Sequence, residues 1–190
     1  MLTLIFNGSP RRNGDTASLI AALRGELAGE VEEISAYRAD ISPCVDCRYC
    51  WKHGRCALRD DMQRVYELLA RADNVVVASP VYFSELTGRM LDMASRLQVY
   101  YAGKRFAGIA PPLKRPKRGA VLLTGGGDGA PDRALASARL LLGCMGVSAA
   151  DEAPCAVSLR TDSLPAREDE AALNAARDIG RMLSRASELP

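Results

Sequence analysis

The sequence lacks several features that would assign it to a common class of protein. No apolar run approaches the roughly 20 residues that a membrane-spanning helix needs, so we expect no membrane partner. The formal net charge is only +2, and such a balance predicts neither a nucleic-acid binder nor an acidic interaction tail. The first residues, MLTLIFNGSPRRNGDT, contain no basic leader, and we therefore expect a cytoplasmic protein.

What the sequence does contain is a regular alternation of short apolar runs and helical patterns. The runs expected to form strands are 2–6, 31–37, 74–79 and 119–124, with a weaker one between 147 and 159. Apolar residues recur at helical spacing between them, most clearly from Leu86 to Tyr101. Five such β-α units predict a doubly wound α/β fold with a five-stranded parallel sheet, formed as a single domain over residues 1–190.

The loops after the first, third and fourth strands should meet at one edge of this sheet. The carboxyl ends of parallel strands lie together, and ligands of such sheets bind there, near the point where the strand order reverses. The three loops are NGSPRRNGDT (7–16), SPVYF (79–83) and TGGGDG (124–129). We therefore expect the ligand-binding residues in these loops.

The first loop predicts a phosphate-binding site. Gly8 and Gly14 allow tight backbone turns that leave amide groups facing an anion, and the helix that begins near Asp15 adds the positive end of its dipole. The lysine and the spacing of a Walker loop are missing, as is G-x-G-x-x-G. The side chains that can add hydrogen bonds or positive charge are Ser9, Arg11, Arg12, Asn13 and Thr16.

The other two loops suit a flat aromatic ligand. Such a ligand needs backbone donors at its edge and apolar or aromatic atoms at its face. SPVYF supplies a proline with Tyr82 and Phe83, and TGGGDG removes three successive side chains so that the backbone can approach closely. Taken singly, each loop is explained equally well as a simple turn, the first one with aromatics that cover the core.

Four cysteines form a compact motif, C-x2-C-x2-C-x5-C, made of Cys44, Cys47, Cys50 and Cys56. A reducing cytoplasm disfavours disulfides, and structural zinc sites usually draw on two separated pairs of ligands. A cubane iron–sulfur cluster binds one thiolate at each of four irons, which suits this spacing. Neighbouring basic residues would stabilise thiolate charge: Arg48, Lys52, Arg55 and Arg59. Four reduced thiols in a loop are the open alternative.

Other conspicuous residues have simpler interpretations. Cys144 and Cys155 lie on an expected helix and an expected strand, and we expect them in the core. The single histidine, His53, is expected in a solvated loop, and Trp51 at an interface. The basic stretch 103–119 is expected to be a solvated, proline-stiffened loop, although it could attract the 2′-phosphate of NADPH or an acidic partner.

Three segments resemble the flavodoxin-like, NAD(P)H-dependent FMN reductases. They are G-S-P-R-x-x-G-x-T at 8–16, S-P-V-Y-F at 79–83 and D-D-M at 60–62. The cysteine motif resembles that of the iron–sulfur flavoproteins, a branch of this family. In the helix after S-P-V-Y-F many relatives carry a lysine and an Asp-Arg pair, where this chain has Leu91, Ser95 and Arg96 and matches only at Arg96.

The resemblance, which covers about the first two thirds of the chain, implies a three-layer α/β/α fold that binds FMN and uses NAD(P)H as hydride donor. The implied FMN-binding residues are Ser9, Pro10, Arg11, Asn13, Thr16, Pro80, Val81, Tyr82, Phe83, Thr124, Gly125, Gly126 and Gly127. It also implies a homodimer or a higher homo-oligomer, and a small-molecule or protein electron acceptor.

Two further functions stay open at this point. In one, FMN and one [4Fe-4S] cluster at Cys44, Cys47, Cys50 and Cys56 relay single electrons from a ferredoxin-like protein without turnover of NAD(P)H. In the other, the chain is a flavin-free regulatory module based on zinc or on its thiols. The sequence does not distinguish NADH from NADPH.

Overall fold

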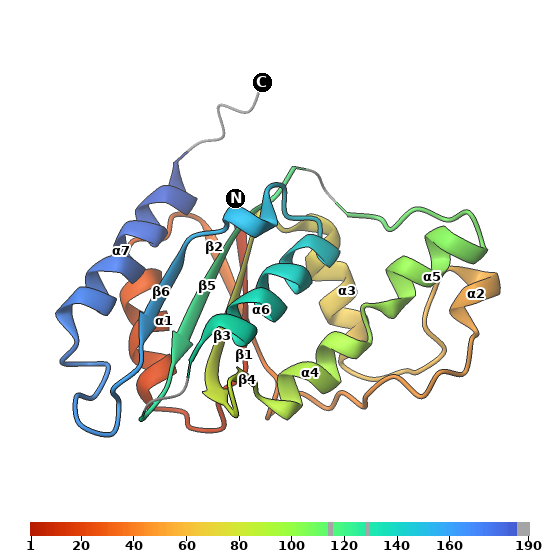
Figure 1. Ribbon diagram of the computed structural model, residues 1–190. Helices are drawn as coiled ribbons and strands as arrows, with labels where there is room; N and C mark the ends of the chain where they lie inside the picture. Colours follow the sequence, from red (N-terminus) through yellow and green to blue (C-terminus); the bar gives the residue numbers. More distant parts are fainter. Residues whose placement is uncertain (114–115, 128–129, 186–190) are drawn as a thin grey trace.

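A parallel β-sheet forms the centre of the computed structural model, which describes residues 1–113, 116–127 and 130–185 (Figure 1). Its strands are β1 (Leu2–Asn7), β2 (Glu30–Ser35), β3 (Asn74–Tyr82), β5 (Arg118–Thr124) and β6 (Cys155–Ser158). They lie in the order β2-β1-β3-β5-β6, which is the strand order of flavodoxin-like folds. A two-residue strand, β4 (Glu85–Leu86), pairs antiparallel with the end of β3. The predicted five-stranded parallel sheet is confirmed, with one short strand added.

Helices cover both faces of the sheet and confirm the three-layer arrangement (Figure 1). On one face α1 (Asp15–Arg24) packs against α7 (Glu170–Ser184). The other face carries α3 (Met62–Arg71), α4 (Gly88–Ser95) and α6 (Asp132–Cys144), with a short 3₁₀ turn, η1 (Ala150–Glu152), after α6. Beyond this layer, α2 (Cys50–His53) and α5 (Gln98–Phe106) pack together as a lobe. In the ranges described, no helix is long and apolar enough to cross a membrane; the cytoplasmic location stays a prediction.

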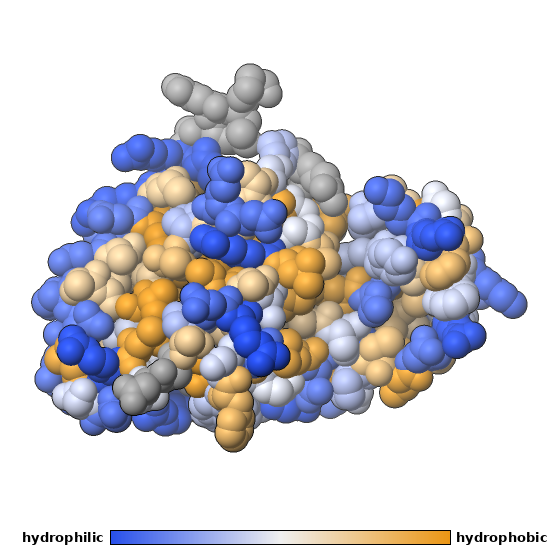
Figure 2. All heavy atoms as spheres, in the orientation of Figure 1, coloured by the Kyte–Doolittle hydropathy of each residue, from blue (hydrophilic) through white to orange (hydrophobic). Residues whose placement is uncertain are grey.

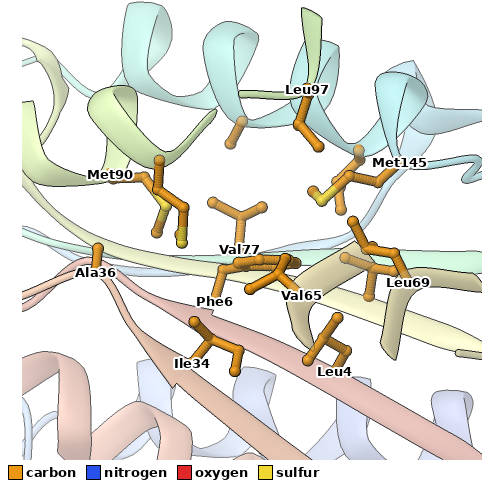
Figure 3. Close-up of a cluster of buried hydrophobic side chains, with 14 of the residues drawn as sticks. Leu4, Phe6, Ile34, Ala36, Val65, Leu69, Val77, Met90, Leu97 and Met145 are labelled. Carbon is orange, nitrogen blue, oxygen red and sulfur yellow. The ribbon is translucent and has the colours of Figure 1, made fainter. Parts of the chain in front are cut away.

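The central strands β1, β3 and β5 are buried on both sides because both faces of the sheet are covered. Phe6 and Val77 belong to the cluster under α3, α4 and α6, whereas Ile5 packs with α1 and α7. Figure 3 shows Met90 and Leu97 pointing from above toward Val77 and Phe6. A fully buried side chain of the size of Met90 contributes about 1.5–3 kcal/mol to stability. The contact of Met90 with the sheet therefore holds α4 in place.

The helical pattern from Leu86 to Tyr101 is divided in the structure. α4 ends at Ser95, and α5 begins only at Gln98. Apolar residues continue to be buried across the break, as at Leu97 and Tyr100, and for this reason the sequence predicts one continuous helix. The break directs α5 toward α2 and so creates the lobe.

Two predictions about single residues are wrong. Cys144 is exposed, because it lies two positions after Leu142 and so on the opposite side of α6 from the buried face. Lys117, in the basic stretch expected to be solvated, is 1% exposed, and its Nζ donates to the carbonyl of Ala72 at 2.6 Å. Cys155 is half-buried. Lys114 and Arg115 of the same basic stretch lie outside the described residues.

Candidate functional site

The three loops predicted to bind a ligand do meet at the carboxyl edge of the sheet. Thr16 Oγ1, at the start of α1, lies 2.8 Å from Thr124 Oγ1 at the end of β5. Thr87, just before α4, donates from Oγ1 to the carbonyl of Gly8 at 2.8 Å, and its N–H donates to Ser79 Oγ at 3.3 Å. The Thr87–Gly8 and Thr16–Thr124 bonds connect residues 79 and 108 positions apart in the chain. We call this place the three-loop edge.

Hydrogen bonds within the first loop hold its conformation. Ser9 is 2% exposed; its N–H donates to Asn7 Oδ1 at 2.8 Å, and its Oγ accepts from the N–H of Arg11 at 3.2 Å. A Cβ on Gly8 would lie only 2.9 Å from Ser79 Oγ. A side chain at this position would therefore displace its neighbours, because the loop backbone lies directly against the end of β3.

The side chain of Arg11 has a local partner that the sequence did not reveal. Its Nη2 donates to Asp15 Oδ2 at 2.7 Å, and the side chain is 69% exposed. Exposed ion pairs contribute at most about 1 kcal/mol, so a bound anion can compete with Asp15 for this guanidinium. Pro10 and Asn13 are also exposed, whereas Thr16 is buried. The predicted phosphate residues thus divide into an exposed group and a buried pair, Ser9 and Thr16.

The second loop presents aromatic side chains to solvent. Tyr82 is 46% exposed and Phe83 fully exposed, so the alternative in which they cover the core is wrong. Phe83 and Ser84 have positive φ angles of 53° and 63°, a conformation that costs about 1–2 kcal/mol for a residue with a Cβ. Such strain clusters at binding sites. Pro80 and Val81, which precede the two aromatics, are half-buried.

The third loop leaves its backbone accessible. The N–H of Gly125 donates to the last carbonyl of β6 at 2.8 Å, which anchors the loop to the sheet. Gly126 and Gly127 are exposed, and Gly127 adopts a positive φ of 74° that favours glycine. Asp128 and Gly129 lie outside the described residues.

The four clustered cysteines line one cavity of about 420 Å³ between the segment 44–58 and α5. Cys44 and Cys47 are exposed, Cys50 and Cys56 are half-buried, and none forms a disulfide. Within the part of the chain that the structure describes, no three His, Cys, Asp or Glu side chains are placed to hold a single metal ion. Zinc needs such convergence, with each sulfur about 2.3 Å from one ion. A cubane would bind one thiolate at each of its four irons.

The electrostatics of the cavity disfavour ionisation of Cys50. Burial raises the pKa of Cys50, and the neighbouring thiolates of Cys44, Cys47 and Cys56 raise it further. Each of these three cysteines is thus close enough to Cys50 to disfavour its ionisation. Positive charge inside the cavity, such as the irons of a cluster supply, would allow all four to bind as thiolates.

Aromatic stacking and local strain shape the walls of the cavity. Trp51 of α2 stacks on Phe106 of α5 with ring centroids 4.0 Å apart, so part of the surface predicted to face an interface is used within the chain. Asp46 and Arg48 have positive φ angles of 47° and 58°. Of the five described non-glycine residues with positive φ, two lie in this segment and two are Phe83 of the second loop and the next residue, Ser84. Both places are among those where the sequence predicts binding. His53 is exposed, as predicted, but it ends helix α2 instead of lying in a loop.

Helix α4 connects the three-loop edge to the cysteine cavity. It begins after Thr87 and ends at Ser95, whose Oγ accepts the N–H of Cys44 at 2.9 Å. The next residue, Arg96, donates from Nη1 to the carbonyl of Ser42 at 2.8 Å. Eight helical residues with a rise of 1.5 Å each make α4 about 12 Å long. The two candidate sites are therefore neighbours joined by one helix.

Arg96 is a functional candidate whose role the sequence reasoning missed. Its side chain is 0% exposed and forms a bidentate ion pair with Asp60, at 2.6 Å and 3.2 Å. Burial alone would raise the pKa of Asp60, but the hydrogen bonds and charge from Arg96, with N–H donors of Ser42 and Met62, lower it below its usual value. The signal that could have revealed this pair is an arginine between Met93 and Leu97 in an apolar helical pattern.

Comparison with known proteins identifies the family. The sequence profile of the NADPH-dependent FMN reductases matches residues 1–160. The chain belongs to this family. The NADPH-dependent FMN reductase family consists of oxidoreductases, so the chain is an oxidoreductase, and the match extends beyond the first two thirds that the motifs indicated.

Relatives of this FMN reductase family member carry a more specific name. The chain is similar to an "iron-sulfur flavoprotein" of Archaeoglobus fulgidus, with 28% identity over 184 residues that cover 95% of this chain and 78% of that protein. It is similar to another of Methanocaldococcus jannaschii, with 33% identity over 124 residues, 64% of this chain and 60% of that protein. Against that second relative the chain matches less than two thirds of the length.

The fold is shared with solved structures. The chain is similar to the "NAD(P)H:quinone oxidoreductase from Methanothermobacter marburgensis", with a TM-score of 0.69, 19% identity, and coverage of 100% of this chain and 98% of that one. At this identity the likeness concerns the fold. It agrees with the flavodoxin-like strand order.

Proposed function

We propose that the protein is an FMN-dependent NAD(P)H oxidoreductase that passes electrons from a nicotinamide cofactor through the flavin to a second acceptor, a small molecule or a protein. The observation that carries this proposal is the three-loop edge, where the Thr16–Thr124 and Thr87–Gly8 bonds hold the loops together. FMN, when bound, supplies the chemistry of hydride acceptance and electron release. The protein supplies binding and orientation.

The residues present fit FMN. The first loop and the start of α1 offer backbone N–H groups and the exposed guanidinium of Arg11 to a phosphate. The buried hydroxyls of Ser9 and Thr16 hold this loop in place through their bonds to Arg11 and Thr124. The exposed rings of Tyr82 and Phe83 and the bare backbone of 125–127 offer a face and an edge to a flat ring system. Family membership supports the same assignment.

Titration of the apo-protein with FMN tests this proposal. Thr16→Ala removes a buried hydroxyl of the cradle, and we expect the Kd for FMN to rise at least tenfold. Ser18→Ala, on the same helix, removes only a 3.5 Å bond to Gly14 and should leave the Kd unchanged. Arg11→Ala, whose side chain is exposed and so not needed for folding, should also weaken binding. Wild-type affinity in both Thr16→Ala and Arg11→Ala would refute the assignment.

A second candidate function is favoured by the cysteine cavity. We propose that Cys44, Cys47, Cys50 and Cys56 hold one [4Fe-4S] cluster and that the protein relays single electrons with a ferredoxin-like partner. The support is that four thiols line one cavity at the end of a helix about 12 Å long that starts at the three-loop edge. The names of the curated relatives agree.

Three measurements on protein purified without oxygen distinguish the candidates. A ratio of about four irons per FMN means a cubane cluster, whereas flavin without iron leaves a plain reductase with free thiols. Rapid bleaching of the flavin by NADPH without any partner supports the reductase. Iron together with no bleaching by NADPH or NADH supports the electron carrier. A colourless protein that FMN does not stabilise against heat would indicate the flavin-free module.

We also propose that the chain forms a homodimer. A groove of about 490 Å³ lies between α5 and α6, and large apolar side chains are exposed along it, namely Leu91, Tyr101 and Leu140. Figure 2 shows hydrophobic surface over α6 and in the hollow beside α5. Sedimentation should give a dimer for the wild type and a monomer for Leu140→Glu. A monomeric wild type contradicts the proposal.

A further inference from the structure

We propose that Asp15 is a positioning residue of the FMN site, and that it competes with the phosphate group of the flavin for Arg11. One oxygen of the Asp15 carboxylate holds the loop after β6, residues 159–169, which we call the fourth loop. The other oxygen holds the guanidinium of Arg11. The inference rests on the proposed FMN site and adds the residue that sets how strongly this site prefers a phosphorylated flavin.

Both oxygens of Asp15 are in use at the start of α1. Oδ2 accepts from Arg11 Nη2 at 2.7 Å, and Oδ1 accepts the N–H of Ala166, 151 positions further along the chain, at 3.0 Å. The Asp15 side chain is 13% exposed, and Ala166 is 0% exposed. A carboxylate in the first turn of a helix interacts favourably with the helix dipole. That interaction explains an acidic residue at this position, but it does not require a bond to a distant loop.

The fourth loop borders the three-loop edge on the side of β6. The N–H of Thr161 donates to the carbonyl of Gly125 at 3.0 Å, and a Cβ added at Gly126 would lie 3.4 Å from the Cβ of Asp162. The fourth loop therefore packs against the third loop. Through Asp15 it is also attached to the first loop, so one carboxylate connects both sides of the proposed phosphate site.

The Arg11 side chain lies over the backbone of the first loop. A Cβ added at Gly14 would lie 2.9 Å from Arg11 Cβ and 3.0 Å from its Nε, so the side chain crosses Gly14 to reach Asp15. A guanidinium binds carboxylates and phosphates through the same N–H groups. The free N–H groups at the start of α1 favour an anion at this place. An incoming phosphate must therefore take Arg11 away from Asp15 or share it.

Titration of the apo-protein with FMN and with riboflavin, which lacks the phosphate, tests the competition. Asp15→Asn keeps one oxygen for the N–H of Ala166 and replaces the oxygen that binds Arg11 by an NH₂ group. The Kd for FMN should fall about three- to fivefold, the range of an exposed ion pair, while the Kd for riboflavin stays unchanged. In an Arg11→Ala background the same change should leave the Kd for FMN unchanged. The matched control is Asp178→Asn, which removes an exposed partner of Arg181 on α7 and should change neither Kd.

Hydrogen exchange of the Ala166 amide tests the other oxygen. Asp15→Ala removes both bonds, so this amide should exchange at least tenfold faster than in the wild type. In Asp15→Asn the bond to Ala166 is kept, and the exchange rate should stay close to that of the wild type. Equal exchange in Asp15→Ala and the wild type overturns the attachment of the fourth loop.

The two flavins separate competition from mere structure. A purely structural role of Asp15 predicts that Asp15→Asn affects FMN and riboflavin equally. Unchanged or weaker FMN binding in Asp15→Asn, equal tightening of both flavins, or the full gain in the Arg11→Ala background overturns the inference. If Asp15→Asn does not fold, Asp15→Ser, which also suits a helix start, decides by the same comparison. A wild type that binds neither flavin overturns the FMN site together with this inference, whereas FMN binding that the variants leave unchanged overturns this inference alone.

Discussion

A methyl group added at Gly8 should disrupt the three-loop edge more than any surface change nearby. The new Cβ would lie 2.9 Å from Ser79 Oγ, 3.0 Å from Thr87 Oγ1 and 3.1 Å from Met90 Cε. Overpacking of this kind costs about 1–3 kcal/mol. Displacement of Thr87 would also weaken its bond to the Gly8 carbonyl, which is worth about 0.5–1.5 kcal/mol. Together these effects predict a loss of about 2–4 kcal/mol in the free energy of unfolding.

Urea and thermal unfolding of the apo-protein measure this loss. For a chain of this length, 1 kcal/mol corresponds to about 2–4 °C, so the Tm of Gly8→Ala should fall by roughly 4–16 °C. The Kd for FMN should rise in parallel, because the first loop must move away from the second. The matched control is Gly88→Ala: no atom lies within 4 Å of its Cβ position, and alanine favours a helix by up to about 1 kcal/mol.

The control should therefore unfold at the same temperature as the wild type or slightly higher, with unchanged FMN affinity. The reasoning is refuted if Gly8→Ala stays within about 0.5 kcal/mol of the wild type, the range of ordinary surface substitutions. A loss of stability with unchanged FMN affinity would leave the packing argument intact and contradict the placement of FMN at this edge.

Three other changes test separate parts of the structure. Phe83→Gly relieves a positive φ of 53° at a fully exposed position. Urea unfolding should therefore show unchanged stability or a gain of about 1 kcal/mol, while FMN binding weakens. A clear loss of stability would contradict the strain argument. Asp60 has a lowered pKa because its partners outweigh burial, so the folded state binds its proton less readily than the unfolded state, whose pKa is about 3.9. The stabilisation from the Asp60 carboxylate is thus complete above about pH 3.9, the unfolded-state value, and is lost as the pH falls through the lower folded-state pKa. The difference in unfolding free energy between wild type and Asp60→Asn should therefore shrink from pH 7 to pH 3. A constant difference would refute the assignment. Lys117→Met keeps most of the buried volume but removes the bond to Ala72, and chemical denaturation should show a loss of about 1–3 kcal/mol, against no loss for the exposed Lys104→Met.

Much of the fold could be predicted because its signals are local. The apolar run NVVVAS predicts a central strand, and β3 begins at the same Asn74. The loops that follow β1, β3 and β5 could be placed at one edge because parallel strands end together. The motif G-S-P-R-x-x-G-x-T indicated the family, and the matched profile confirmed it. The FMN-binding and cluster-binding roles of individual residues stay predictions.

The sequence by itself determined the order of strands and helices, the edge that carries the loops, and the presence of four cysteines in one segment. These properties depend on the period of apolar side chains and on spacing along the chain. Only the tertiary structure decided that α4 stops at Ser95, that Phe83 faces solvent, and that Arg96 lies beside the cysteine cavity with Asp60, 36 residues away in the chain. The physical reason is that the folded path of the backbone decides which distant residue lies beside a buried charge, and no local sequence pattern specifies that path.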